Sequence, residues 1–350
     1  MLRFDYIKRT LQFNFPAKTS RGAISTKDCF LVKVWDEDTP EIIGWGECNT
    51  LKGLSIDHFE DYEVRLQNWL NELNRINVYL EDLPNLIDKE KLPSFYFAIE
   101  TALLDLKNGG KKIIYDNSFY KGTPIPINGL VWMGDHSFMK EQIDQKLEKG
   151  FDCIKIKVGA LDFEQELSLL KYIRSEYSSD KITLRVDANG AFNIEEALEK
   201  LKRLSDFELH SIEQPIWAGQ WEEMAKLCEV TPIPIALDEE LIGVSSNKKE
   251  ALLDTIKPQY IILKPALVGG LEASAEWITS AEKRNIPWWM TSALESNIGL
   301  NAIAQFTANY LIDKPHGLGT GQLYHNNFES PLTVAKGELY YNCDKSFVIN

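Results

Sequence analysis

Charged residues close five short apolar segments in the second half of the chain. They come in the order lysine, aspartate, glutamate, aspartate, lysine: Lys155 and Lys157, then Asp187, Glu213, Asp238 and Lys264. The three carboxylates are 26 and 25 residues apart, about one strand-plus-helix unit each. In a parallel α/β barrel the carboxyl ends of the strands meet at one face, where active sites lie. The spacing therefore predicts that these side chains converge on one site.

Three carboxylates in a low-dielectric pocket repel one another, and a hard divalent cation removes that cost. Oxygen ligands completed by water favour Mg²⁺, with Mn²⁺ as the substitute. A metal opposite two lysines suits removal of a proton next to a carboxylate, because the metal stabilises the resulting enediolate. A lysine must be neutral to accept a proton, and nearby positive charge favours the neutral form. We expect Lys155 to act on Lys157 in this way.

The same charged strand ends also allow a purely structural explanation. A single Asp or Lys at a strand end is more often a cap or part of a surface ion pair. Five charged strand ends in strict order argue against a purely structural role. A Schiff-base aldolase also uses a barrel lysine, but it offers no role for three aligned carboxylates. A non-catalytic protein stabilised by metal is the remaining alternative, and chelation would then lower its melting temperature without abolishing turnover.

The elements around these residues predict one barrel and a smaller N-terminal domain. The chain has 350 residues, of which 44% are hydrophobic and 26% charged, enough for a substantial core. From about residue 124, apolar runs alternate with amphipathic segments, which is typical of parallel βα units. The runs predicted as strands are 127–132, 153–158, 182–187, 210–213, 233–238, 260–264, 288–292 and a short Gly-rich one near 317–321.

The first third of the chain has a different pattern. Residues 3–15 alternate as a strand does, and two β-rich runs flank an acidic turn at 36–40. Two helices follow, and the second, 94–106, has apolar residues nearly all round and a serine as its predicted cap. We predict a capping domain over residues 1–122, to which a tail at 322–350 returns, and a barrel domain over 123–321.

Charge and cysteine content limit the partners and the compartment. The formal net charge of -14 repels nucleic-acid phosphates and anionic lipid, although lysines and a buried metal can still attract an anionic substrate locally. The five cysteines are scattered without paired spacing, which is typical of reduced thiols. No signal-peptide core and no run of about 18 apolar residues is present. We therefore expect a soluble, cytoplasmic protein with a small anionic carboxylate as substrate, no nucleic-acid or membrane partner, and an oligomeric state that the sequence leaves open.

The charged strand ends occur in motifs that resemble the muconate-lactonizing subgroup of the enolase superfamily. These motifs are Lys-x-Lys at 155–157, Asp-Ala-Asn-Gly from 187, Ile-Glu-Gln-Pro from 212, Asp-Glu-Glu from 238 and Lys-Pro at 264–265. The resemblance covers almost the whole chain. It implies a modified TIM barrel, (β/α)7β, under an α+β capping domain, and it implies Asp187, Glu213 and Asp238 as metal ligands. It also implies Lys157 and Lys264 as the acid/base pair.

Within the subgroup the chain is similar to the o-succinylbenzoate synthase family of menaquinone biosynthesis. The similar segments are residues 289–296 and 317–321, and these motifs are less specific than the catalytic set. The resemblance implies dehydration of 2-succinyl-6-hydroxy-2,4-cyclohexadiene-1-carboxylate to 2-succinylbenzoate. Lys157 would remove the α-proton and return a proton to the departing hydroxyl on the same face, while Lys264 would act as a cation.

Four further residues are candidates for substrate binding. Arg21 and Arg185 each offer a cation for a succinyl carboxylate. Asn189 lies two residues beyond Asp187 and either meets the substrate or caps the next helix. Ser292 is a potential hydrogen-bond donor to the succinyl group.

Other members of the superfamily remain as alternatives. A dipeptide epimerase shares the fold and the catalytic residues, but it needs an acidic residue near the eighth strand to hold an ammonium group. Residues 316–321 read His-Gly-Leu-Gly-Thr-Gly, without an acid. An N-acylamino-acid racemase is harder to separate, because two lysines also suit two-base racemisation, and a cycloisomerase is a third alternative.

Overall fold

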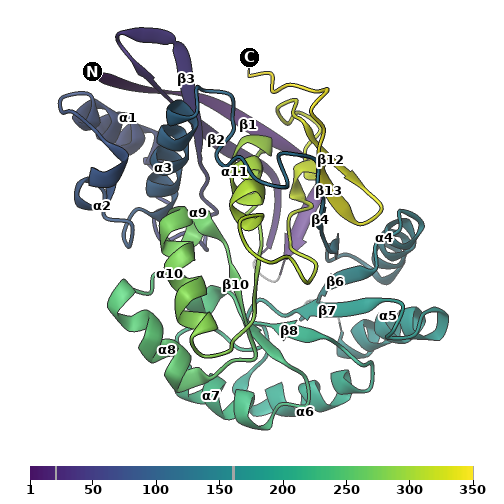
Figure 1. Cartoon of the computed structure of the whole chain (residues 1–350). Helices are drawn as coiled ribbons and strands as arrows, with labels where there is room; N and C mark the ends of the chain where they lie inside the picture. Colours follow the sequence, from purple (N-terminus) through teal and green to yellow (C-terminus); the bar gives the residue numbers. More distant parts are fainter. Residues whose placement is uncertain (20–21, 160–161, 350) are drawn as a thin grey trace.

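Seven parallel strands form the wall of a barrel in the computed structural model, which describes residues 1–19, 22–159 and 162–349. The strands neighbour one another in chain order, as right-handed βα units do. They lie in the lower part of Figure 1, in teal and green. They are β5 (Gly129–Val131), β6 (Cys153–Lys157), β7 (Thr183–Asp187), β8 (Ser211–Glu213), β9 (Ile235–Leu237), β10 (Tyr260–Leu263) and β11 (Trp288–Met290).

The barrel closes through a short segment that contains His316 and Gly317. Gly317 pairs in parallel with Thr291 after β11, and His316 pairs in parallel with Ile127 before β5. The predicted eighth strand was therefore placed a little too late, because a 3-10 turn, η4 (Thr320–Leu323), already begins at its end. With this closure the α/β barrel predicted from the sequence is confirmed.

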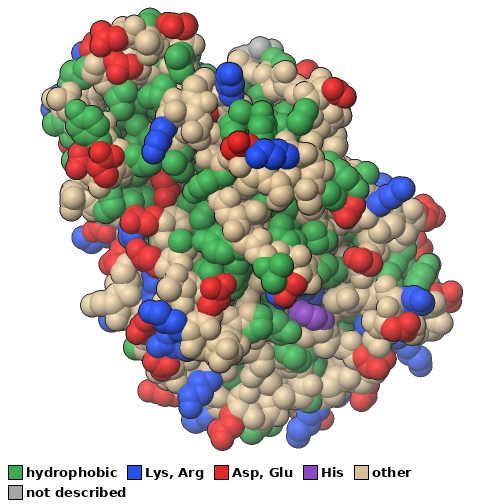
Figure 2. Space-filling model, viewed as in Figure 1, with side chains coloured by type: hydrophobic (Ala, Val, Ile, Leu, Met, Phe, Trp, Pro, Cys, Tyr) green, Lys and Arg blue, Asp and Glu red, His purple; other side chains and the backbone are tan. Residues whose placement is uncertain are grey.

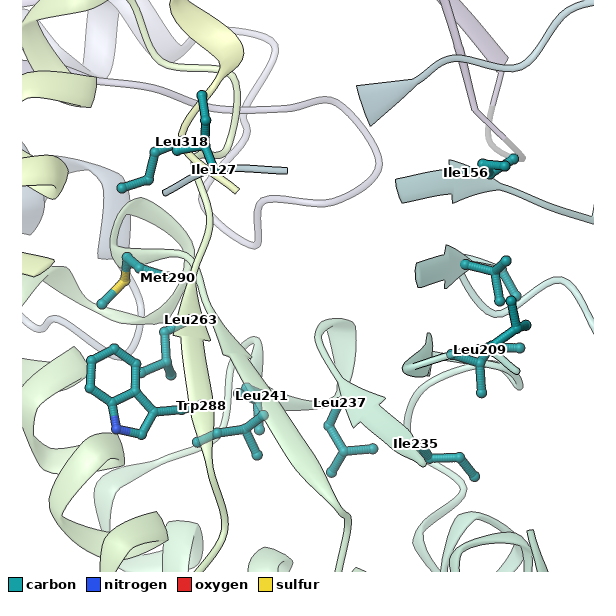
Figure 3. Packing of buried hydrophobic residues seen from close by; sticks show 14 of the residues in the cluster. Ile127, Ile156, Leu209, Ile235, Leu237, Leu241, Leu263, Trp288, Met290 and Leu318 are labelled. Carbon is teal, nitrogen blue, oxygen red and sulfur yellow. The ribbon is translucent and has the colours of Figure 1, made fainter. Parts of the chain in front are cut away.

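Helices surround the barrel and cover the outward face of each strand. Ile154 and Ile156 of β6 belong to the main hydrophobic cluster, while the alternate residues Lys155 and Lys157 face inward. Figure 3 shows this cluster around the barrel. The barrel helices are α4 (His136–Glu148), α5 (Phe163–Glu176), α6 (Ile194–Ser205), α7 (Trp221–Val230), α8 (Lys249–Ile256), α9 (Pro265–Val268), α10 (Gly270–Glu282) and α11 (Asn297–Thr307), with the 3-10 turns η2 (Glu239–Leu241) and η3 (Ser246–Lys248).

The N-terminal region is an antiparallel three-stranded sheet packed against helices, in purple and blue at the top of Figure 1. Gly44 and Gly46 let one of the helices approach the sheet closely, since a Cβ at Gly46 would lie 1.9 Å from the carbonyl oxygen of Ala98. The elements are β1 (Leu2–Thr19), β2 (Gly22–Asp36), β3 (Thr39–Cys48), α1 (Tyr62–Leu73), η1 (Leu80–Asp82), α2 (Leu83–Leu86) and α3 (Pro93–Lys107).

Helix α3 is buried between the N-terminal sheet and the barrel, as its apolar sequence predicts. Phe97 packs in the barrel cluster, whereas Ala98 and Ile99 pack in the cluster under the sheet. The predicted serine cap is wrong: Pro93 occupies the first turn, and Ser94 donates to the buried carboxylate of Asp57 at 2.6 Å instead.

The C-terminal segment contacts both parts of the molecule. The amide nitrogen of Gln12 in β1 donates to Oδ1 of Asn326 at 2.8 Å. Further along, β12 (Leu332–Ala335) and β13 (Glu338–Tyr341) form a small antiparallel sheet with β4 (Ile125–Pro126) at the side of the barrel. The division of the chain at residues 122 and 322 remains a prediction.

The surface in Figure 2 intermixes acidic and basic side chains over one face of the molecule. All five cysteines are free, and only Cys343 is exposed. In the described part of the chain, no helix combines the length and the hydropathy that crossing a bilayer requires.

Candidate active site

The strand register explains why the charged residues meet. In the parallel sheet Lys157 of β6 is the register partner of Asp187 of β7, and Asp187 is the partner of Glu213 of β8. Asp238 directly follows β9, and Lys264 directly follows β10. All of them therefore lie at the carboxyl ends of consecutive strands, at the barrel mouth.

Two lysines of β6 contact the first two carboxylates. The ammonium nitrogen of Lys157 lies 2.9 Å from Oδ2 of Asp187 and 2.7 Å from Oδ1 of Asn189. The ammonium of Lys155 lies 3.0 Å from the same Oδ2 of Asp187 and also contacts Oε2 of Glu213. Both lysines are more than nine-tenths buried, so these contacts are shielded from water.

On the other side of the mouth, the ammonium of Lys264 contacts Oδ2 of Asp238 and lies 4.0 Å from Oε1 of Glu213. Glu213 thus stands between the two groups of lysines. Its Oε1 is buried and accepts no hydrogen bond from any described residue. One oxygen in the middle of the carboxylate row is therefore left for a further positive partner.

The pKa shifts reflect the competition between burial and charge. Burial raises the pKa of the Asp187 carboxyl, but the ammoniums of Lys155 and Lys157 outweigh it and hold that pKa well below its usual value. For Glu213 the balance is opposite, because burial and the Asp187 carboxylate raise its pKa. Burial lowers the pKa of Lys264, yet Asp238 and Glu213 raise it above its ordinary value, which keeps Lys264 a cation.

The carboxylates fit a hard divalent cation in their chemistry, although they do not form a ready ligand cluster. No three acidic, histidine or cysteine side chains of the described residues converge closely enough to hold an ion as they stand. The ammoniums of Lys155 and Lys264 lie against the carboxylate oxygens instead. The orphaned Oε1 of Glu213, between Asp187 and Asp238 in the strand order, is the feature that would suit a cation.

A cavity of about 340 Å³ lies over these groups. The barrel contributes the three lysines, Asp187 and Glu239, and the N-terminal region contributes Asn14, Phe15, Leu51 and Leu54. Glu213 and Asp238 lie behind the lysines and do not reach the cavity wall. The remaining wall mixes apolar side chains, such as Leu130, Trp132 and Leu294, with polar and charged ones, such as Gln142, Lys146 and Lys149. The arrangement suits a small anionic molecule with an apolar body, held next to two lysines.

Two of the predicted substrate contacts line this cavity. Asn189 donates its amide to Oε1 of Glu239 at 3.0 Å while its own Oδ1 accepts from Lys157. Ser292 lines the opposite wall, where its hydroxyl donates to Glu295 and accepts from Thr320 at 2.7 Å.

The two arginines are placed differently. Arg185 faces into the barrel but lies one layer deeper, outside the cavity wall; its guanidinium donates to the carbonyl oxygen of Pro315 at 2.8 Å and stacks over Trp289. Arg21 lies outside the described residues.

Sequence reasoning did not single out a group of buried polar residues behind the cavity wall. Lys27, Glu47 and Asn49 of the N-terminal region are all less than one-tenth exposed, and all bond to the loop that follows β11. Glu47 ends an apolar run, which is the same signal that identified the barrel carboxylates. Lys27 and Asn49 give no comparable signal, because their partners lie far away in the sequence.

Comparisons with known proteins identify the family of the chain. The family described as "Enolase C-terminal domain-like" matches residues 138–342, more than half of the chain. The o-succinylbenzoate synthase of Desulfotalea psychrophila is 44% identical, and the alignment covers 97% of this chain and 98% of the relative. The L-Ala-D/L-Glu epimerase of Bacillus subtilis is 23% identical, over 88% of this chain and 85% of the epimerase.

Solved structures give the same picture of the fold. The crystal structure of MenC from Desulfotalea psychrophila superimposes with a TM-score of 0.83 and 42% identity, covering 97% of this chain and 99% of that one. A dipeptide epimerase from Cytophaga hutchinsonii, solved with Mg and the dipeptide D-Ala-L-Val, has a TM-score of 0.84 at 21% identity, covering 99% of this chain and 94% of that one. The second likeness supports the fold alone. The chain belongs to the enolase superfamily, as a relative of the o-succinylbenzoate synthase of Desulfotalea psychrophila.

Proposed function

We propose that the protein is an o-succinylbenzoate synthase, a hydro-lyase that dehydrates 2-succinyl-6-hydroxy-2,4-cyclohexadiene-1-carboxylate to 2-succinylbenzoate in menaquinone biosynthesis. The observation that carries the proposal is the common cavity onto which Lys157 and Lys264 open from different strands. The 44% identical synthase, aligned over nearly its whole length, supports the choice of this reaction within the superfamily.

Lys157 is the residue that we assign to proton transfer. In its neutral form it removes the proton on the carbon next to the substrate's ring carboxylate. The same ammonium then gives a proton to the departing hydroxyl on the same face, and water leaves as the ring becomes aromatic. One lysine can perform both steps only if it stays in place, and its contacts with Asp187 and Asn189 favour that.

Lys264 acts as a fixed cation. The neighbouring Asp238 and Glu213 raise its pKa, so it holds a positive charge while negative charge develops on the substrate. Asp187, Glu213 and Asp238 would hold Mg²⁺, or Mn²⁺ in its place, which supplies a Lewis acid for the substrate carboxylate. Because aromatisation makes the reaction downhill, the protein's main task is to position and stabilise.

Epimerases and racemases of the same superfamily are the alternatives, since two lysines on one cavity also suit two-base proton exchange. A dipeptide substrate needs an anion for its ammonium group. The cavity wall formed by residues 317–323 contains no acidic residue, which disfavours a dipeptide. An N-acylamino acid has no free ammonium group and needs no such anion. An experiment therefore has to distinguish a racemase of these substrates from the synthase.

The test follows two reactions with one preparation of Mg²⁺-loaded protein. Loss of the cyclohexadiene absorbance measures dehydration, and deuterium uptake in D₂O measures α-proton exchange on N-succinylamino acids and dipeptides. Dehydration that is at least about a hundredfold more efficient than exchange supports the synthase. Efficient exchange without dehydration would assign the protein to the racemases or epimerases instead.

A further inference from the structure

The loop between β11 and α11 forms one wall of the cavity, and it holds a strained residue. Leu294 has a φ of 65°, in the left-handed region that leucine rarely adopts. Its side chain lines the cavity together with Ser292 and Ala293. A glycine would adopt this backbone conformation without strain, so the leucine side chain is kept at a conformational cost. Something outside the loop must stabilise it.

Two donors from distant parts of the chain bind the carbonyl oxygen of Leu294. Lys27 of β2 donates its ammonium at 2.7 Å, and Tyr324 donates its hydroxyl at 2.7 Å. Next to them, the side-chain amide of Asn49 donates to the carbonyl oxygen of Ala293 at 2.7 Å. The peptide groups on either side of Leu294 are therefore held from the N-terminal region and the C-terminal segment.

Lys27 has the features of a positioning group. It is only 7% exposed, and among the described residues its ammonium bonds to amide oxygens, those of Leu294 and Asn49, without an ion pair to a carboxylate. A buried ammonium on a backbone carbonyl makes a strong, charge-assisted hydrogen bond. Its effect is to fix the peptide group that follows Leu294, while Asn49 fixes the peptide group that precedes it.

The other end of the loop is held by a second residue of the N-terminal region. Glu47, fully buried, accepts hydrogen bonds from the amide and hydroxyl of Ser296 at 2.8 and 2.6 Å and from the amide of Gly299 at 2.9 Å. These bonds fix the first turn of α11, which packs beside β3 (Figure 1). Both ends of the cavity wall thus depend on the N-terminal sheet.

We propose that Lys27 is a positioning residue that acts through Leu294, by holding its strained backbone so that its side chain forms the apolar wall beside the bound substrate. The inference rests on the proposed function and deepens it. It names the contact, between Lys27 and the carbonyl oxygen of Leu294, that positions the wall next to the non-reacting part of the substrate. Lys27 does not touch the substrate. Its removal should therefore change KM much more than kcat, since Lys157 and Lys264 stand on other strands.

The test uses Lys27→Met, which keeps the length of the side chain and removes the donor. We expect KM for the cyclohexadiene substrate to rise about tenfold, with kcat changed less than about threefold. Lys33→Met is the matched control on the same strand, because Lys33 pairs with Asp5 on the surface, and its KM should equal that of the wild type. An unchanged KM in folded Lys27→Met protein overturns the proposal, whatever the melting temperature.

A glycine at position 294 provides the decisive comparison. Leu294→Gly relieves the strain, so adding Lys27→Met to it should change KM less than about twofold. An equal rise of KM in the wild-type and Leu294→Gly backgrounds would show that Lys27 acts by another route. If Lys27→Met does not fold, Tyr324→Phe removes the second donor to the same carbonyl; a raised KM supports the proposal and an unchanged one overturns it. Absence of wild-type turnover would overturn the proposed function instead.

Discussion

The side chain of Asn189 accepts a hydrogen bond from Lys157, with 2.7 Å between Oδ1 and the ammonium nitrogen. Asn189 has a φ of 45°, and its amide is anchored on Glu239 at 3.0 Å. It therefore orients the lysine that we assign to proton transfer. Asn189→Ala should lower kcat by about ten- to a hundredfold. Steady-state kinetics check this, with Asn193→Ala, at the start of α6, as the control; unchanged kcat in Asn189→Ala would contradict the orienting role.

Removal of divalent cations should abolish turnover and lower stability. Dialysis against a chelator is expected to reduce kcat by about a hundredfold or more, because the developing enediolate loses its Lewis acid. Mg²⁺ should restore it and raise the melting temperature, since a ligand that binds only the folded state stabilises that state.

A variant distinguishes Mg²⁺ binding at the predicted site from adventitious Mg²⁺ binding elsewhere on the protein. Glu213→Gln should lose the rise in melting temperature on addition of Mg²⁺, whereas Glu222→Gln on the exposed side of α7 should keep it. If Glu213→Gln protein is stabilised as strongly as the wild type, the three carboxylates do not form the cation site.

Stability should fall on mild acidification because of His316. Its Nδ1 accepts a hydrogen bond from the amide of Met290 at 2.9 Å, so the ring must stay unprotonated at that nitrogen. Burial, together with Arg185 and Lys314, lowers the pKa of His316 to about 3, against about 6.5 in an unfolded chain. The folded state thus gains stability above pH 6.5 that is lost as the pH falls towards 3, by about 2 kcal/mol at pH 5.

Chemical unfolding at pH 7 and pH 5 measures this loss. His316→Asn, which retains an acceptor, should show a smaller difference between the two pH values than the wild type. The difference will not vanish, because burial also lowers the pKa of His210, to about 4. An equal pH dependence in wild type and variant would exclude His316 as the cause.

Gly46 should tolerate no side chain. An alanine Cβ there would lie 1.9 Å from the carbonyl oxygen of Ala98 and 2.7 Å from Oγ1 of Thr101, so α3 would have to move off β3. We expect Gly46→Ala to reduce the free energy of unfolding by about 3 kcal/mol, measured from the urea midpoint. Gly319→Ala is the control, because its Cβ would meet the end of the Ile127 side chain at 3.3 Å and the carbonyl oxygen of Asn128 at 3.7 Å, with no contact as close as those at Gly46. Equal midpoints for the two variants would contradict this account of the interface.

Much of the barrel and its charged rim could be predicted because both follow from local patterns. In the barrel, each apolar run that is closed by one of the predicted site charges, such as Ile212 before Glu213, is a strand whose carboxyl end lies at the mouth. The alternation of inward and outward residues does not show how deep an inward side chain lies along the barrel axis. Arg185 shares an inward face with Asp187, but the register places it one layer below the cavity.

Long-range contacts set the limit of sequence reasoning. The bond between Lys27 and the carbonyl of Leu294 joins residues 267 positions apart, and nothing near Lys27 in the sequence signals it. Likewise, the sequence predicted that lysines flank the carboxylates, but not that Lys155 and Lys264 would contact them directly. Those contacts depend on how neighbouring strands are aligned, which only the folded sheet determines.

The most direct test of the central claim is the rate at which Mg²⁺-loaded protein aromatises the cyclohexadiene substrate, compared with its Lys157→Ala variant. The account predicts a kcat/KM of about 10⁴ M⁻¹s⁻¹ or more for the wild type. Lys157→Ala should lower it by at least about a thousandfold, with an unchanged melting temperature as evidence of folding. No turnover by folded, metal-loaded wild type, or turnover that survives in Lys157→Ala, would contradict the account.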